Sequence, residues 1–155
     1  MNTAHPLTEQ EITLLWKLFS QTHSTITQYL DKGLRAHTKM KLDDFQVLAV
    51  LAEGYKKDKE PPVVRMGKLS STLVLSPSRL TYQVGRLIDI GWVERINVEQ
   101  DRRGKGVYLT PQGYKQFRAA RTVHTDLIQN LLRNTDSNEI VAMSTLMKRI
   151  LNDII

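Results

Sequence analysis

Apolar residues that recur at intervals of three and four predict a long amphipathic helix near the beginning of the chain. It starts after Thr8, which can form a capping box with Glu11, and we expect it to end near Arg35. A second helix is predicted over residues 42–53, with Gly54 ending it. The first third of the chain is therefore expected to be helical.

Two further helices are predicted in the middle of the chain, joined by a tight turn. The first covers residues 65–74 and has apolar residues on one side only. The second begins at Ser76 and Pro77, because serine is a favoured N-cap and proline suits the first helical position. It runs to Ile90 and ends at Gly91, since glycine readily adopts the left-handed conformation that closes a helix.

Two alternating, β-branched segments follow and predict a hairpin. Residues 92–98 form its first strand and residues 106–110 its second, with a polar, charged loop at 99–105 between them. Residues 63–64 could add a very short strand. Two helices joined by a tight turn and followed by such a hairpin form a winged helix-turn-helix.

The rest of the chain predicts two more amphipathic helices. Thr110 and Pro111 repeat the arrangement of an N-cap followed by proline, and a last helix follows Asp136. The apolar stripes of these helices and of the first helix are too long for one small core to bury. We therefore expect a second copy of the chain to cover them, in a homodimer with two-fold symmetry.

The predicted fold is mainly α-helical with a small β-hairpin wing. It is a winged helix-turn-helix flanked by long dimerisation helices. A chain of 155 residues is long enough for one domain with its own hydrophobic core. We expect a single domain over 1–155, with a DNA-binding lobe at 36–110 and dimerisation helices at 8–35 and 111–155.

The charge of the chain is positive and unevenly distributed. The net charge is +6, and neither residues 61–88 nor residues 102–125 contain an acidic side chain. Their basic residues are Arg65, Lys68, Arg79, Arg86, Arg102, Arg103, Lys105, Lys115, Arg118 and Arg121. Such bias suits a polyanion, because cationic side chains displace counterions from phosphates. Charge alone is equally consistent with a solvated basic face.

The helix predicted at 77–90 has the side chains that a major-groove reader needs. Its apolar residues fall within about 100° of arc at the helical period of 3.6 residues. They are Leu80, Val84, Leu87 and Ile88. The opposite face carries Ser78, Arg79, Tyr82, Gly85, Arg86 and Asp89, with Thr81 and Gln83 on the flanks. Arginine can bond guanine and glutamine can bond adenine. The alternative is an ordinary solvated helix, although this face lacks the Glu and Lys that such helices favour.

The tip of the predicted hairpin carries Arg102, Arg103 and Lys105. An arginine on a narrow tip can enter the minor groove, where A·T tracts concentrate negative potential. We expect Asp101 to bond Arg103 or a neighbouring arginine and so to fix the direction of its guanidinium group. An ordinary charged turn is the alternative, and the position of the tip after the 77–90 helix favours a role in DNA binding.

Residues 65–113 resemble the MarR family of bacterial regulators. The most specific motifs are Ser-Pro-Ser-Arg-Leu-Thr at 76–81, Asp-Arg-Arg-Gly at 101–104 and Leu-Thr-Pro-Gln-Gly at 109–113. Leu15 and Trp16 in the first helix also fit, and the resemblance covers nearly the whole chain. One departure is Gly85, where the family often has a bulkier residue.

The resemblance implies a homodimer that binds an inverted-repeat operator in double-stranded DNA as a sequence-specific transcriptional regulator, which we expect to be a repressor. It places DNA contacts at 76–86 and a minor-groove arginine at Arg103. The residues predicted to bind DNA are Ser76, Ser78, Arg79, Thr81, Tyr82, Gln83, Arg86, Arg95, Asp101, Arg103 and Lys105.

Many members of the family release DNA when a small, often aromatic, ligand binds between the dimer helices and the DNA-binding lobe. Candidate lining residues are Trp16, Phe19, His23 and Phe45. Core packing is the simpler interpretation of the three aromatic residues, and a surface position is the simpler interpretation of the histidine.

Other functions find less support in the sequence. A metal-responsive regulator of the same fold is the alternative, because His5, His23, His37 and His124 could meet between subunits, although no two of them are four residues apart. The chain has no cysteine, and it lacks the motifs of zinc proteases, phosphate loops and serine hydrolases. We predict no enzymatic activity and no cofactor. Without a signal peptide or an apolar span, a cytoplasmic location away from the membrane is expected.

Overall fold

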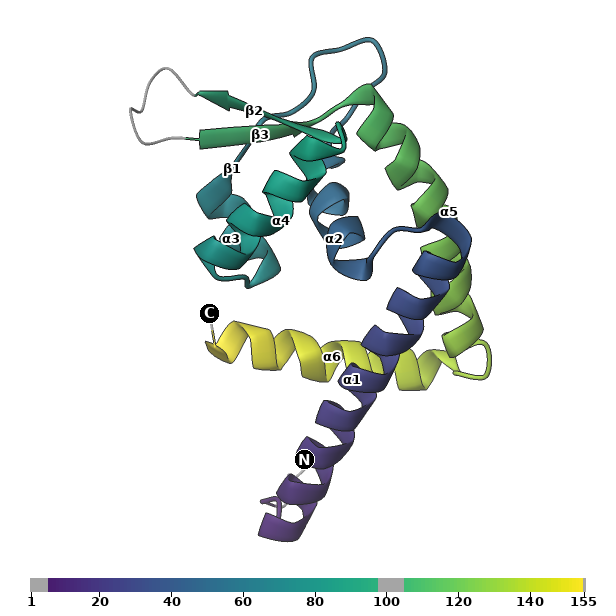
Figure 1. Cartoon of the computed structure of the whole chain (residues 1–155). Helices are drawn as coiled ribbons and strands as arrows, with labels where there is room; N and C mark the ends of the chain where they lie inside the picture. Colours follow the sequence, from purple (N-terminus) through teal and green to yellow (C-terminus); the bar gives the residue numbers. More distant parts are fainter. Residues whose placement is uncertain (1–5, 98–104, 155) are drawn as a thin grey trace. The chain divides into compact units, whose positions relative to one another are not determined.

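The computed structural model describes residues 6–97 and 105–154. The chain divides into two compact units, Met1–His124 and Thr125–Ile155. The first contains the winged helix-turn-helix, and the second contains the end of one long helix and the whole of the last (Figure 1). The mainly helical fold with a small antiparallel sheet confirms the predicted fold class.

Helix α1 spans Glu9–Thr38 and begins with the predicted capping box. The backbone N–H of Glu11 donates to Thr8 Oγ1 at 3.3 Å, and the backbone N–H of Thr8 donates to Glu11 Oε2 at 2.8 Å. The helix continues three residues beyond the predicted end at Arg35. It stops where Lys39 takes the left-handed conformation, with φ 58°, and its N–H bonds the Arg35 carbonyl.

Helix α2 spans Leu42–Leu51 and is anchored to α1 at its start. The backbone N–H of Leu42 donates to Asp31 Oδ1 at 2.9 Å, and Arg35 Nε contacts the other oxygen of the same carboxylate at 2.5 Å. The helix ends two residues before the predicted position 53. Gly54 follows in a turn with φ 75°, a conformation in which glycine carries no steric penalty.

Helices α3, Met66–Leu73, and α4, Pro77–Asp89, form the predicted helix-turn-helix. The turn between them contains Val74 in the left-handed conformation at φ 53°. Ser76 caps α4, accepting a hydrogen bond from the backbone N–H of Arg79 at 3.4 Å. Gly91 follows α4 with φ 77°, as its predicted role in ending the helix requires.

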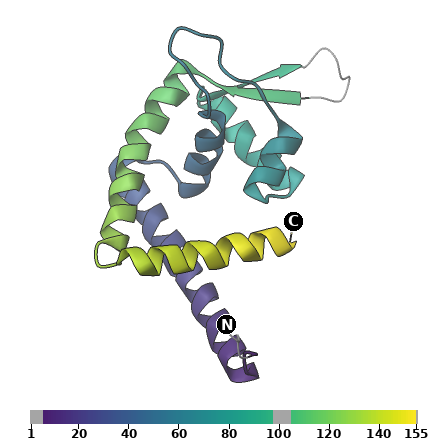
Figure 2. The same ribbon diagram turned by 180° about the vertical axis from the view of Figure 1, so that it is seen from behind.

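Strands β2, Val93–Asn97, and β3, Lys105–Leu109, form the predicted hairpin. The short strand β1, Val64–Arg65, pairs antiparallel with β3 on its other side, so the strand order is β1-β3-β2. Figures 1 and 2 show α2, α3 and α4 together beneath this sheet. Because β1 directly precedes α3 and pairs with β3, it connects the helix-turn-helix to the β2–β3 hairpin that forms the wing.

The hydrophobic core of the first unit lies between these helices and the sheet. Its largest fully buried side chains come from α1, the α1–α2 link, α2, α3, α4 and both hairpin strands. They are Leu34, Met40, Val47, Leu48, Leu51, Leu69, Leu80, Val84, Leu87, Val93, Val107 and Leu109. Because α4 buries one side here, its opposite side is held facing outward.

Helix α5, Pro111–Leu132, starts at a closely packed junction with the end of α4. Thr110 Oγ1 donates to the Gly91 carbonyl at 2.8 Å and accepts from the Gly113 N–H at 3.0 Å. Further along α5, the rings of Phe117 and His124 lie 5.6 and 4.5 Å from the ring of Phe45. These contacts connect α5 to both α4 and α2.

Helix α6, Ser137–Ile154, buries none of its described side chains. Asp136 caps it by accepting hydrogen bonds from the N–H groups of Asn138 and Glu139 at 2.7 and 3.0 Å. Its exposed apolar residues include Val141, Met143, Ile150, Leu151 and Ile154. Within the described residues, no helix is long and apolar enough to cross a membrane.

Candidate nucleic-acid interface

Helix α4 presents a polar, exposed face opposite the core. Ser76, Ser78 and Thr81 are exposed, and the Tyr82 side chain is 72% exposed. The backbone around position 85 is open, because a Cβ atom added to Gly85 would meet nothing within 4 Å. This face has room for a large partner along the first three turns of the helix.

Gln83 does not belong to this face, which corrects its assignment as a base-reading residue. Its exposed fraction is 5%, and its Nε2 atom has no hydrogen-bond partner within the described structure. The physical reason is its position one turn before Leu87 and one residue before Val84, both of which are fully buried. Its amide group therefore faces the core.

Arg79 and Arg86 lie at the edge of the buried side and are paired with acids of α2. Arg79 Nη2 donates to Asp43 Oδ2 at 3.0 Å, and Arg86 Nη2 donates to Asp44 Oδ2 at 2.9 Å. The first pair is exposed, with side chains 61% and 51% accessible. In the second pair Arg86 is 33% accessible and Asp44 only 4%.

The buried pair limits the freedom of Arg86, whose predicted DNA contact stays a prediction. Asp44 is a nearly inaccessible carboxylate, and removing its arginine would leave a buried charge uncompensated. Arg86 therefore helps to hold α4 against α2. The sequence shows two acids at the start of α2, but nothing in their spacing identified their partners on α4.

The sheet places Arg95 on the exposed surface of β2. In the same hairpin the Tyr108 hydroxyl donates to the Glu94 carboxylate, and this hydrogen bond raises the pKa of Tyr108. Asp101 and Arg103 lie outside the described residues, as does the side chain of Lys105, whose backbone belongs to β3. Their roles stay predictions.

The four candidate ligand residues divide into two groups. Phe45 is 7% exposed and packs against Phe117 and His124, so it belongs to the core. Trp16 and Phe19 are exposed and stack on each other with ring centroids 5.9 Å apart. His23 is also exposed on α1, where its backbone carbonyl accepts a hydrogen bond from Thr27 Oγ1.

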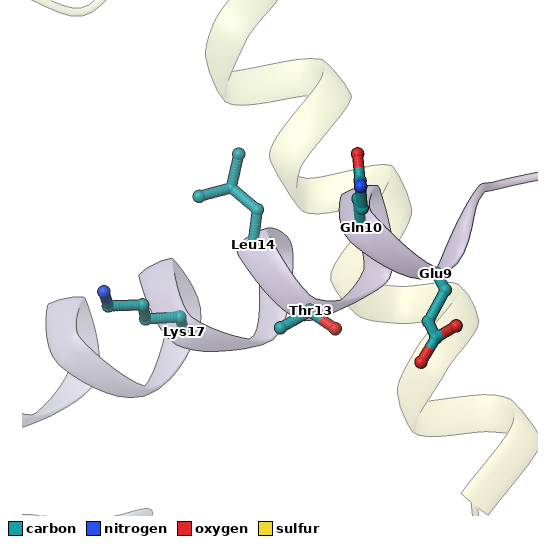
Figure 3. Close-up of a pocket in the computed structure, with 5 residues that line it drawn as sticks. All are labelled: Glu9, Gln10, Thr13, Leu14 and Lys17. Carbon is teal, nitrogen blue, oxygen red and sulfur yellow. The ribbon is translucent and has the colours of Figure 1, made fainter.

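A hollow on the outside of α1 offers no alternative ligand site. Figure 3 shows the side chains that line it, and all come from the first turns of this one helix. They are Glu9, Gln10, Thr13, Leu14 and Lys17, each exposed. Ligand pockets normally bury most of the ligand surface, which one exposed helix face does not do. Across residues 6–97 and 105–154, no three His, Asp or Glu side chains gather as a metal site would require.

Several curated proteins are similar to this chain, although no family model matches it. The HTH-type transcriptional regulator PecS of Dickeya dadantii is 25% identical over 132 residues, which are 83% of this chain and 77% of PecS. The HTH-type regulator YpoP of Bacillus subtilis is 31% identical over 103 residues, covering 66% of this chain and 64% of YpoP. The multiple antibiotic resistance protein MarR of Salmonella typhimurium is 33% identical over 85 residues, covering 54% of this chain and 59% of MarR.

Several solved structures have a fold similar to that of this chain over almost its whole length. The MarR family regulator Sco3205 of Streptomyces coelicolor, solved in complex with DNA, gives a TM-score of 0.84 at 24% identity and covers 97% of this chain and 94% of its own. A mutant MarR of E. coli complexed with operator DNA gives 0.79 at 24% identity, with coverage of 94% and 99%. A MarR family regulator of Silicibacter pomeroyi gives 0.77 at 26% identity, with coverage of 95% and 97%. With its helix-turn-helix and its hairpin, the chain has the winged helix-turn-helix fold of these MarR family regulators.

Proposed function

We propose that this chain is a sequence-specific regulator that binds double-stranded DNA through α4 and the wing. The observation that carries the proposal is the exposed polar face of α4. Ser76 caps this helix, and burial of its apolar side in the core leaves the polar face directed outward. The DNA complexes of Sco3205 and of E. coli MarR, whose folds are similar, support it. A helix presented in this way fits the major groove of B-form DNA.

The proposed contacts on α4 are made by Ser76, Ser78, Arg79, Thr81 and Tyr82. Hydroxyl groups at the start of a helix can bond phosphates or base edges, and Tyr82 can contact a thymine methyl group or a phosphate. The proposed wing contacts are Arg95, Asp101, Arg103 and Lys105. Gln83 is left out because it faces the core, and the contact by Arg86 stays a prediction because its guanidinium group is bound to Asp44.

We further propose that the protein acts as a homodimer. Exposed apolar side chains on α1, among them Ile12, Leu15 and Leu18, and on α6 would otherwise be left in water. The dimerisation helices would be residues 8–35 and 111–155. Two copies of α4 related by a two-fold axis would contact half-sites about 34–36 Å apart and so select an inverted repeat.

Repression with release by a small aromatic ligand is the proposed mode of regulation. A repressor needs only to occupy its operator, which a dimer with two recognition helices can do. The exposed stack of Trp16 and Phe19 is the aromatic surface that such a ligand would meet, whereas Phe45 is already covered by Phe117 and His124.

Binding to a duplex selected from a random-sequence library tests the proposed function. Tyr82→Ala on α4 and Arg103→Ala on the wing should each weaken binding by roughly 1–3 kcal/mol, about 5- to 150-fold. Lys57→Ala in the loop between α2 and β1 is the matched control for the lost charge, and should leave the affinity close to that of the wild type. Wild-type affinity should also fall steeply with salt. Failure to enrich any duplex, or an affinity that does not respond to salt, would refute the proposal.

A further inference from the structure

Helix α2 begins with two consecutive acids that hold two arginines of α4. Asp43 and Asp44 lie in the first turn of α2, and Arg79 and Arg86 are two helical turns apart on α4. Figure 1 shows α2 and α4 as neighbouring helices, and the two ion pairs measure 3.0 and 2.9 Å. The pairs are similar in chemistry and in length, so burial is what distinguishes them.

The difference in burial gives the two pairs different freedom to exchange. Separating Arg86 from Asp44 would leave a carboxylate that is only 4% accessible without its counter-charge, which is costly. Asp43 is 51% accessible, so water can replace Arg79 at small cost. The Arg79–Asp43 pair is therefore the one that a competing anion can open.

Arg79 also lies where DNA would approach. It is in the first turn of α4, and its own backbone N–H is bonded by the Ser76 cap. Recognition helices present this end to the major groove, surrounded by phosphates. The 3.0 Å bond from Nη2 holds the guanidinium group beside Asp43, so moving the whole group to a phosphate or a base would break this bond.

We propose that Asp43 competes with DNA for Arg79 and thereby limits the affinity of the recognition helix. The proposal rests on the proposed function, since it concerns the same surface. In the free protein the Asp43 carboxylate accepts a hydrogen bond from the Arg79 guanidinium group, as a DNA phosphate would. On DNA the group moves to the nucleic acid, and the lost ion pair is subtracted from the binding free energy.

Asp43→Asn tests this competition because it removes the charge and keeps the shape of the side chain. Exposed ion pairs are weak, so the variant should bind the selected duplex about two- to fivefold more tightly than the wild type. A merely structural role for Asp43 would not tighten binding. Urea unfolding of both proteins checks that α2 stays folded after losing an acid from its first turn.

A double-mutant cycle with Arg79→Gln separates competition from simple repulsion between Asp43 and phosphates. Competition predicts that Asp43→Asn has no effect in the Arg79→Gln background. Repulsion predicts the same gain in both backgrounds, which would overturn the proposal. Asp89→Asn, at the far end of α4, removes an equal charge without an ion pair to Arg79, and should give a smaller gain than Asp43→Asn.

The outcomes distinguish this inference from the proposed function. If the wild type selects and binds a duplex but Asp43→Asn weakens binding or leaves it unchanged, the competition is refuted and DNA binding stands. If the wild type binds neither the selected duplex nor a scrambled duplex of equal length, the proposed function itself is refuted.

Discussion

Two glycines on either side of the hairpin differ in what surrounds them. A Cβ atom added to Gly113 would lie 2.0 Å from the Trp92 carbonyl oxygen and 2.8 Å from the carbonyl carbon, both backbone atoms. One added to Gly85 would meet nothing within 4 Å. Gly113 is therefore needed for the close approach of α5 to the start of the hairpin, and Gly85 is not needed for folding.

Replacing each glycine by alanine should change stability in opposite directions. Gly113→Ala should lower the free energy of unfolding by about 1–3 kcal/mol, because backbone must shift to admit the methyl group. Gly85→Ala should raise it by about 1 kcal/mol, since alanine favours a helix interior. Urea unfolding of the two variants measures both changes, and equal stability of the two proteins would contradict the packing described at Gly113.

The residues that cap helices could be predicted from the sequence, whereas those at the edge of a buried face could not. Thr8, Ser76 and Gly91 act as predicted because capping depends on a few neighbouring residues. The positions of Gln83 and Arg86 could not be predicted in this way. Helical periodicity shows where the centre of the buried side lies but not how far that side extends around the helix. Whether a polar side chain at its edge faces inward depends on a distant partner such as Asp44.

At the scale of elements, α5 and α2 are joined by stacked rings. His124 lies 4.5 Å from Phe45 between ring centroids, and burial lowers the pKa of His124 below its usual 6.5. The unfolded chain therefore takes up this proton at a higher pH than the folded chain does. The difference in pKa makes the free energy of unfolding depend on pH. The stability that comes with a neutral His124 is fully present above pH 6.5 and is lost as the pH falls through the lower pKa of the folded state.

His124→Phe should remove this dependence while keeping an aromatic ring against Phe45. The free energy of unfolding of the wild type should decrease relative to that of the variant as the pH is lowered from about 7.5 to 5.5. Urea unfolding at several pH values gives the difference between the two proteins. A difference that stays constant across this range, or that changes in favour of the wild type, would show that His124 is not held neutral in the folded state.

The sequence predicted which helices and strands exist and in what order, but it predicted the residues at which they end less accurately. Helix α1 runs to Thr38 because Lys39 closes it, and a lysine gives no signal for a left-handed cap. The start of α2 depends on the bond from the Leu42 N–H to Asp31, which joins positions eleven residues apart. Local patterns identify helices, but such tertiary hydrogen bonds decide where they stop and start.

At the scale of the whole molecule, the exposed apolar residues of α1 and α6 predict self-association. Sedimentation equilibrium should give twice the chain mass of 17.8 kDa. Ile150→Glu should reduce it to the mass of one chain, because a carboxylate cannot be buried unpaired in an apolar interface. Val63→Glu makes the same change at another exposed apolar residue, outside α1 and α6, and should leave the dimer intact. A wild-type protein with the mass of one chain would contradict the proposed dimer.

Footprinting on selected genomic fragments shows whether α4 binds DNA as one of two symmetric copies. We predict that the chain enriches specific fragments and protects one inverted repeat, with half-sites about one helical turn apart, 34–36 Å between centres. Tyr82→Ala should weaken protection of both half-sites together. Protection of a single unrepeated site would rule out binding by two symmetric copies, and no enrichment over the input fragments would rule out sequence-specific binding.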